Sequence, residues 1–136
     1  MAQYKIEDVE GIGPAYGEKL RSVGVTNTDE LLTTGKTRKG RGDLAQKTGI
    51  SDSLILKWVN MVDLYRIKGI GSEFSELLER SGVDTVKELK HRVAANLVKK
   101  MTEVNTEKNL TRRVPTESVV ADWIEQAAKL PAAVEY

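Results

Sequence analysis

Apolar residues recur at helical spacing along most of the chain. After Pro14, the apolar residues Tyr16, Leu20 and Val23 follow at positions i, i+4 and i+7. This spacing predicts a helix that begins at Pro14, a residue suited to the first helical position, and ends at Gly24 in a left-handed cap. No window alternates apolar and polar residues as a half-buried strand does. The pattern therefore predicts an all-α protein.

Three more helices are predicted before residue 65. Thr26 or Thr28 is expected to cap a short helix, and residues 42–48 form a second short helix that ends at the next glycine. Ser51 or Asp52 is expected to cap a longer third helix. The wide apolar face of this helix consists of Leu54, Ile55, Trp58, Val59 and Val62.

An internal repeat organises the chain. Residues 11–31 align with residues 69–89 at a constant offset of 58, and nine of the 21 positions are identical. Unrelated segments of this length would share roughly one, so the repeat indicates a tandem duplication. The identical pairs are Gly11/Gly69, Ile12/Ile70, Gly13/Gly71, Glu18/Glu76, Leu20/Leu78, Gly24/Gly82, Val25/Val83, Glu30/Glu88 and Leu31/Leu89.

The similarity continues weakly beyond this stretch, where Trp58 matches Trp123 at an offset of 65. We expect two units, residues 1–65 and 66–136. The second unit should repeat the apolar plan of the first, with Phe74 in the place of Tyr16 and Val119 on the same face as Trp123. The two tryptophans, Tyr16 and Phe74 are expected to be core residues. No Pro/Ser-rich linker separates the two, which predicts that the second unit is packed on the first.

A Gly-Ile-Gly turn stands between two helices in each unit. The turn Gly11–Gly13 precedes Pro14, and the turn Gly69–Gly71 precedes Ser72. The glycines permit a tight turn, and the central Ile is expected to point inward. The following helix then begins with unpaired N–H groups at the positive end of its dipole, a small anion site. A nucleic-acid phosphate suits it, and such a contact carries no sequence information.

The segments GIGPAYGEKL and GIGSEFSELL resemble the helix-hairpin-helix motif of DNA ligases, repair polymerases, excision nucleases and Holliday-junction-binding proteins. The motif usually carries Ala where Gly17 and Ser75 stand here. The resemblance implies that the hairpin backbone and a nearby basic side chain hold DNA phosphates without regard to sequence. Residues 44–58, with TGIS in place of GIG, resemble a second, degenerate hairpin. Many members of the family hold two hairpins in one five-helix unit, so the resemblance implies that each half of this chain is a unit of roughly five helices. The full-length pattern is also similar to an uncharacterised bacterial domain family, which implies no established activity.

A basic segment supplies further candidate contacts. Residues 33–43, TTGKTRKGRGD, hold four cations and three glycines. They are expected to form a mobile, exposed loop that reaches phosphates beside the first turn; the alternative is a solvated loop that serves solubility. The candidate DNA-binding residues are Gly11, Ile12, Gly13, Pro14, Lys19, Lys36, Arg38, Lys39, Arg41, Gly69 and Gly71.

The second turn is less suited to phosphate than the first. Glu73, Glu76 and Glu79 follow it, and Arg80 is the one nearby cation. Three carboxylates on this helix would repel a phosphate. Gly69 and Gly71 stay among the candidate DNA contacts, but a structural role or a protein-binding surface is favoured for the second turn.

Composition narrows the function classes. The 136 residues carry 21 Lys plus Arg and 20 Asp plus Glu, a net charge of +1, with no Cys and one His. The absence of Cys excludes thiolate metal sites. The one histidine, His91, is expected to be a surface residue of a helix, which argues against a hydrolytic triad. The sequence predicts no enzyme, cofactor, metal or small-molecule substrate. The lack of a long apolar run predicts no membrane contact and a cytoplasmic location. The favoured hypothesis is a weak, non-specific DNA-binding module, and the alternative is a protein-interaction or scaffold module.

Overall fold

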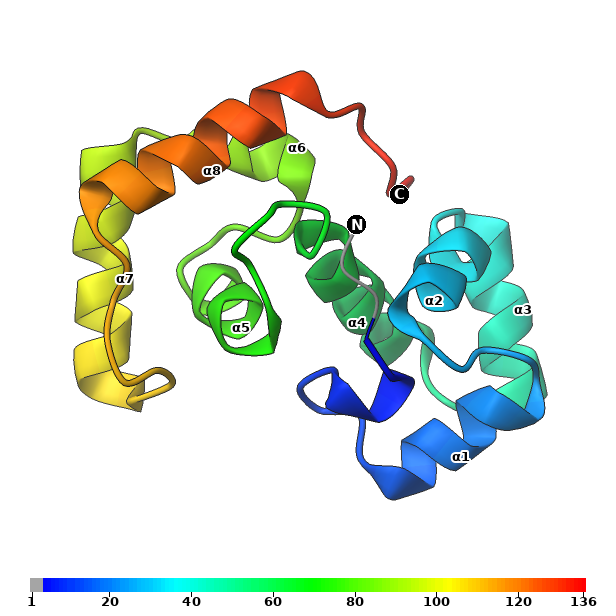
Figure 1. The fold of residues 1–136 in the computed structure, drawn as a ribbon. Helices are drawn as coiled ribbons and strands as arrows, with labels where there is room; N and C mark the ends of the chain where they lie inside the picture. The colour runs from blue at the N-terminus through cyan, green and yellow to red at the C-terminus, as the bar shows by residue number, and fades with distance from the viewer. Residues whose placement is uncertain (1–3) are drawn as a thin grey trace. The chain divides into compact units, whose positions relative to one another are not determined.

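The computed structural model describes residues 4–136, and its regular elements in that range are all helical (Figure 1). The prediction of an all-α protein is confirmed. An isolated antiparallel bridge joins Lys5 to Asn27. The elements are the 3-10 helix η1 (Ile6–Asp8) and the α-helices α1 (Pro14–Ser22), α2 (Thr28–Gly35), α3 (Arg38–Thr48), α4 (Asp52–Leu64), α5 (Ser72–Arg80), α6 (Val86–Leu89), α7 (Ala94–Lys108) and α8 (Glu117–Lys129).

The described chain divides into two compact units. The first unit holds residues 4–63 together with the segment Ala133–Tyr136. The second unit holds Leu64–Ala132. The final residues of the chain therefore belong with the N-terminal half. Within the described range, no helix is both long enough and apolar enough to cross a bilayer.

Helix boundaries in the first unit follow local signals. Helix α1 begins at Pro14 as predicted, and Gly24 behind it has a φ of +87°. Helix α4 is capped by Ser51, one of the two expected residues, whose Oγ accepts the N–H of Leu54 at 3.3 Å. Gly49, with a φ of +74°, ends α3 as predicted.

The predicted cap of α2 is wrong. Asn27 caps this helix, because its Oδ1 accepts the N–H of Glu30 at 2.9 Å. Thr28 is instead the first helical residue, and its buried hydroxyl accepts the N–H of Tyr4 at 3.1 Å. Asn is a better N-cap residue than Thr, and Thr28 is engaged by a tertiary hydrogen bond instead.

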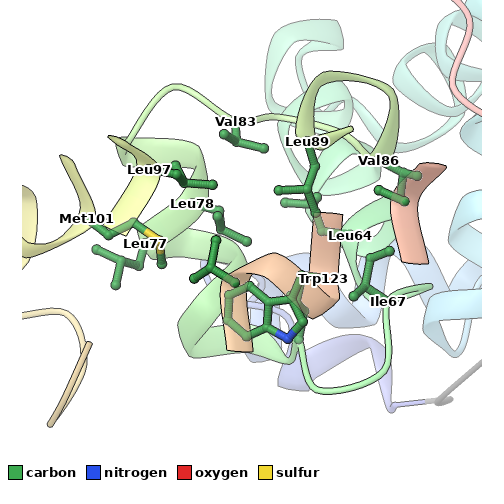
Figure 2. Packing of buried hydrophobic residues seen from close by; sticks show 13 residues of the cluster. Leu64, Ile67, Leu77, Leu78, Val83, Val86, Leu89, Leu97, Met101 and Trp123 are labelled. Carbon is green, nitrogen blue, oxygen red and sulfur yellow. The ribbon is translucent and has the colours of Figure 1, made fainter. Parts of the chain in front are cut away.

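The second unit surrounds Trp123 of α8. Figure 2 shows the indole among aliphatic side chains of the same unit, and Trp123 is 2% exposed. The prediction that this tryptophan is a core residue is confirmed. Val119, one turn earlier, was expected on the same face but is 42% exposed. The buried cluster consists of Leu64, Ile67, Ile70, Leu77, Leu78, Val83, Val86, Leu89, Leu97, Met101, Val120, Trp123 and Ala127.

Candidate nucleic-acid interface

The first Gly-Ile-Gly turn links η1 to α1. Gly11 has a φ of +91°, in the left-handed region that favours glycine, and Gly13 is extended with φ −89° and ψ −172°. Ile12 is 2% exposed, and its N–H donates to the carbonyl of Val9 at 3.0 Å. The inward Ile12 is as predicted, so any ligand of the turn would meet main chain rather than this side chain.

The side chain of Trp58, on α4, packs against the turn. Trp58 is fully buried, and its Nε1 lies 3.2 Å from the position that a Cβ on Gly11 would take. The ring of Tyr16 meets the indole edge-on, with 5.1 Å between centroids. Tyr16 is 37% exposed, so the prediction that it is a core residue holds for one face of the ring alone. This contact holds the turn against the body of the first unit.

The start of α1 carries no side-chain cap. Gly13 is its N-cap residue, and no side-chain hydrogen bond closes this end of the helix in the described part of the chain. Pro14 has no N–H, but the N–H groups of Ala15 and Tyr16 stand in the first turn, and both residues are exposed. The neighbouring helices α2, α3 and α4 do have side-chain caps, supplied by Asn27, Thr37 and Ser51. An anion at α1 would meet open donors and the positive end of the helix dipole.

The second turn has the same backbone geometry. Gly69 has a φ of +102°, and Gly71 is an extended N-cap without a side-chain hydrogen bond. Ile70 is 2% exposed. Trp123 Nε1 lies 3.0 Å from the Cβ position of Gly69, and Phe74 packs on the indole with 5.4 Å between centroids. Both turns therefore rest on a buried tryptophan of a later helix in their own unit.

The surroundings of the second turn differ. Gln126 of α8 accepts the Lys68 N–H at 2.8 Å and donates to the Lys68 carbonyl at 3.1 Å. A shallow depression of about 700 Å³ lies beside the turn, lined by Lys68, Gly69, Ser118, Val119, Asp122, Trp123 and Gln126. The sequence analysis missed Lys68 and Gln126. A signal was present, because Lys68 aligns in the repeat with Glu10, which reverses the charge before the glycine.

The carboxylates that follow the second turn are partly neutralised. Arg80 lies 4.0 Å from a carboxylate oxygen of Glu76 and 3.9 Å from one of Glu79. Glu73, in the first turn of α5, is exposed. The helix start at Gly71 therefore presents a carboxylate where the start of α1 presents none.

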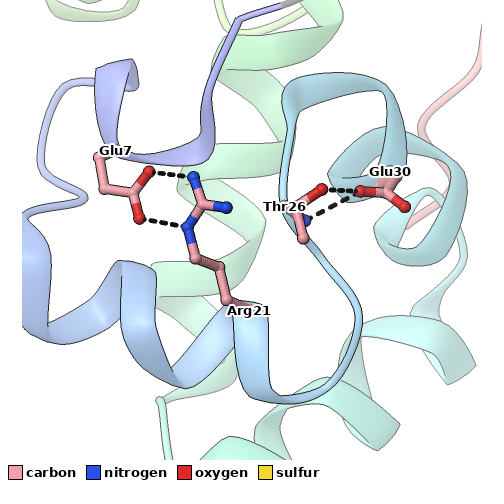
Figure 3. Close-up of polar contacts among 4 residues, drawn as sticks. All are labelled: Glu7, Arg21, Thr26 and Glu30. Atoms are coloured by element: carbon pink, nitrogen blue, oxygen red, sulfur yellow. Dashed lines mark hydrogen bonds and ion pairs between the residues drawn. The ribbon is translucent and has the colours of Figure 1, made fainter.

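A bidentate ion pair joins η1 to the last turn of α1 (Figure 3). Arg21 donates from Nε and Nη2 to the two carboxylate oxygens of Glu7, at 2.7 and 2.6 Å. These hydrogen bonds hold the pKa of Glu7 at about 2, below its ordinary value of 4.5. Arg21 is thereby engaged within the protein. Lys19, which carries the same charge on the same helix, is exposed.

Gly17 leaves room for this pair. A Cβ on Gly17 would stand 2.6 Å from the Glu7 Oε2 and 2.7 Å from its Cγ. Gly inside a helix costs about 0.5–1 kcal/mol relative to Ala. The glycine therefore accommodates the packing of Glu7 across α1.

The prediction of a mobile loop over residues 33–43 is wrong. Helix α2 continues to Gly35, and α3 already begins at Arg38 behind the cap Thr37, whose Oγ1 accepts the Gly40 N–H at 2.9 Å. A Cβ on Gly35 would stand 2.6 Å from a methyl of Val59, and one on Gly40 would stand 2.0 Å from the carbonyl oxygen of Thr34. These two glycines permit close packing between elements.

Arg41 is not available as a phosphate contact. It is 5% exposed, and its Nη1 donates to the carbonyls of Gly35 and Lys36, each at 3.0 Å. Its Nη2 donates to the carbonyl of Glu135. The guanidinium thus satisfies carbonyls at the end of α2, which an isolated helix leaves open. Composition could not distinguish this buried arginine from its exposed neighbours.

The remaining candidates occupy three places in the fold. Gly11, Gly13 and Pro14 form the open face of the first turn with the buried Ile12 between them, and Lys19 is exposed farther along α1. Lys36, Arg38 and Lys39 are exposed at the junction of α2 and α3. Gly69 and Gly71 belong to the turn of the second unit.

A comparison with protein families matches residues 10–130, which include both turns and the helices that support them. No curated protein and no solved structure matches the chain. The matching family is described as a domain of unknown function, and that description assigns it no activity. The match covers most of the 136 residues, so the chain belongs to the family described as Domain of unknown function (DUF4332).

Proposed function

We propose that this chain is a non-enzymatic module that binds the DNA backbone without regard to sequence, through the turn Gly11–Gly13. The observation that carries the proposal is the uncapped start of α1, flanked by the exposed Gly11 and Pro14, beside three helices that do have side-chain caps. Main-chain N–H groups at a helix start are suited to a phosphate oxygen. They read no base, so the contact would position DNA rather than specify a sequence.

We also propose that the two units arose by tandem duplication and that each turn is a helix-hairpin-helix turn. The support is the repeated sequence together with the repeated geometry of Gly11 on Trp58 and Gly69 on Trp123. The second turn has an exposed carboxylate, Glu73, at its helix start. We therefore assign DNA contact to the first turn and a structural role to the second.

Salt dependence is the first test of the proposal. Four of the predicted cations are exposed, namely Lys19, Lys36, Arg38 and Lys39. If each neutralises one phosphate, the logarithm of affinity falls with the logarithm of salt at a slope of about −3.6. Affinity for a fluorescent duplex, measured by anisotropy, should then drop roughly 100-fold between 50 and 200 mM salt. No binding at 50 mM salt would refute the proposal.

Gly13→Ser separates DNA binding from folding. A Cβ at Gly13 meets nothing within 4 Å and φ there is negative, so the serine fits and can cap the open N–H groups of α1. Thermal stability should stay the same or rise, while DNA affinity falls about 10-fold, the value of one hydrogen bond to a charged group. The matched control is Gly71→Ser in the second turn, which should leave DNA affinity unchanged. Equal affinities of the parent and Gly13→Ser would contradict a role for the first turn.

The basic residues at the start of α3 need a separate test. Arg38→Glu combined with Lys39→Glu reverses two exposed charges and leaves the buried Arg41 in place. If these residues contact DNA, the double variant should bind at least 10-fold more weakly at 50 mM salt, with a shallower salt slope. Unchanged affinity would confine the interface to the first turn.

A second candidate function is a protein-interaction surface at the second turn. The observation that favours it is the shallow depression beside Gly69, which includes the 42% exposed Val119. Val119 would supply the apolar contact of such a surface, and the polar residues of the depression would surround it. Light scattering on the parent and on Val119→Lys tests self-association: an oligomer that the substitution disrupts, with no DNA binding, would favour this function.

A further inference from the structure

The last residues of the chain lie along the junction of α2 and α3 in the first unit. The N–H of Glu135 donates to the carbonyl of Lys36 at 2.7 Å, and the Glu135 carbonyl accepts from Arg41 Nη2. The next residue, Tyr136, donates from its hydroxyl to Asn60 Oδ1 at 3.1 Å. Val134, on the other side of Glu135, is 9% exposed. The tail is thus held through both main-chain groups of one residue and through the side chains on either side of it.

The receiving surface comes from the first unit without help from the tail. Arg41 is fixed by the carbonyls of Gly35 and Lys36, so its guanidinium is already oriented when the tail arrives. Lys36 closes α2, where helix carbonyls lack internal partners, and one of these carbonyls pairs with the tail. Asn60 is 8% exposed on α4. The first unit therefore holds three groups in place for the tail: the Lys36 carbonyl as acceptor, the Arg41 guanidinium as donor and the amide of Asn60.

This arrangement recognises an extended peptide. The N–H and the C=O of Glu135 are both hydrogen-bonded, one to a main-chain carbonyl and the other to an arginine side chain, and main-chain hydrogen bonds of this kind hold extended peptides. The exposed cations Lys36, Arg38 and Lys39 beside Arg41 suit the acidic Glu135 side chain in charge. Specificity would come from the flanking residues, since Glu135 itself is held by its main chain.

We propose that the α2–α3 junction around Arg41 is a binding site for an extended peptide, that Val134–Tyr136 is its resident occupant, and that the same segment of a second copy can replace it. The site goes beyond the DNA contact proposed for the first turn and does not depend on it. A tethered tail acts at an effective concentration of about millimolar, so the parent chain should accept an outside peptide poorly.

Glu135→Pro in the full chain opens the site. Proline removes the N–H that donates to Lys36 and restricts the backbone of the tail, so the tail is held less tightly, while the residues that receive it are unchanged. A fluorescein-labelled peptide with the sequence of residues 130–136 should bind this variant at least 10-fold more tightly than it binds the parent, measured by anisotropy. Glu135→Ala is the matched control, because it keeps the N–H and should bind as weakly as the parent. No saturable binding to a folded Glu135→Pro chain would overturn the proposal.

Peptide variants test the chemistry of recognition. A peptide with Pro in place of Glu135 should not bind the Glu135→Pro chain, and one with Ala there should bind within a few-fold of the natural sequence. A Phe in place of Tyr136 removes the hydroxyl that donates to Asn60 and should weaken binding about 5- to 10-fold. Equal binding of all these peptides would show non-specific adhesion and contradict the site.

Hydrogen exchange on the parent chain provides a measurement that needs no variant. The Glu135 amide is hydrogen-bonded, so it should exchange at least 10-fold more slowly than in the isolated peptide of residues 130–136. Saturating amounts of that peptide, which compete for the site, should make it exchange faster. Exchange of Glu135 at the rate of the isolated peptide would show that the tail does not occupy the site and would overturn the proposal.

Discussion

The indole nitrogen of Trp58 lies 3.2 Å from the point where a Gly11 side chain would begin, and the nitrogen of Trp123 lies 3.0 Å from the equivalent point at Gly69. Both glycines have positive φ angles, +91° and +102°. Each turn thus needs glycine for two reasons, the backbone conformation and the tryptophan beneath it. The second glycine of the first turn, Gly13, has neither constraint, and this difference makes the turn testable.

Gly11→Ala should destabilise the protein while Gly13→Ala should not. Alanine at a positive φ costs about 1–2 kcal/mol, and at Gly11 its methyl group must also displace Trp58. At Gly13, alanine lowers the entropy of the unfolded chain, which stabilises the protein, but it is also a poorer N-cap residue than glycine. The two effects oppose one another, so the free energy of unfolding should change by less than about 1 kcal/mol. Urea denaturation of both variants measures the difference. Equal stabilities would show that the turn does not have this backbone.

Gly40→Ala and Gly42→Ala distinguish a helix from a mobile loop in the basic segment. A Cβ on Gly40 would stand 2.0 Å from the Thr34 carbonyl oxygen, so we expect a loss of at least 2 kcal/mol, in the range of overpacked sites. A Cβ on Gly42 meets nothing within 4 Å, and alanine there should stabilise α3 by about 0.5–1 kcal/mol. Thermal melts compare the two. In a mobile loop both substitutions would be nearly neutral.

The pair of Glu7 and Arg21 should make stability depend on pH in acid. The pKa of Glu7 is lowered from 4.5 to about 2, so below pH 4.5 the unfolded chain binds the proton more readily than the folded chain does. The contribution of Glu7 is therefore complete above about pH 5.5 and is lost as the pH falls through 4.5 towards 2. The free energy of unfolding, measured by urea denaturation, should be higher for the parent than for Glu7→Gln above about pH 5.5, and this difference should become smaller as the pH falls.

Arg21→Gln is the control for this profile, because it removes the partner and leaves the carboxyl group in place. In the Arg21→Gln variant the pKa of Glu7 should lie near its ordinary value of 4.5, because the hydrogen bonds from Arg21 are the main cause of the lowered pKa. NMR titration of the Glu7 carboxyl carbon reads this directly. A midpoint near 4.5 in the parent would mean that the pair does not form in solution.

Gly17→Ala should couple to Glu7. When Gly17→Ala is made in the otherwise unchanged chain, the added methyl group would stand 2.6 Å from Glu7 Oε2, so the Glu7 side chain must move. Its hydrogen bonds with Arg21 are then weakened, and the pKa of Glu7 rises from about 2. In a Glu7→Ala background nothing opposes the methyl group, and the better helix former should raise stability by about 0.5–1 kcal/mol. A double-mutant cycle by urea denaturation measures this coupling. Additive effects would contradict the contact.

Signals within a few residues of each helix end located most of the α-helical plan. Pro14 at the start of α1, Gly49 at the end of α3 and Ser51 before α4 act on backbone groups no more than four residues away. The choice of Asn27 over Thr26 or Thr28 at α2 was missed because all three can cap a helix. It depends on Tyr4, whose N–H reaches the Thr28 hydroxyl from 24 residues away.

The basic segment was misread for a related reason. Glycine and lysine are common in mobile loops, and the same composition also fits a helix whose glycines face close neighbours. The neighbour of Gly35 is Val59, a residue from α4, and the partner of Arg41 is the carbonyl of Glu135, which lies 94 residues along the chain. No local pattern contains either contact.

The sequence by itself determined the helical class, the repeated Gly-Ile-Gly turns with their inward isoleucines, and the family to which the chain belongs. The first two features depend on periodicity and on backbone preferences within a few residues, and the third depends on the similarity of residues 10–130 to the family. The tertiary structure decided which basic side chains are exposed to a ligand and which are bonded within the protein. Arg41 is buried against carbonyls, Arg21 is paired with Glu7, and Lys19 is exposed. Charge is a property of a residue, but its availability depends on what the fold places within hydrogen-bonding distance.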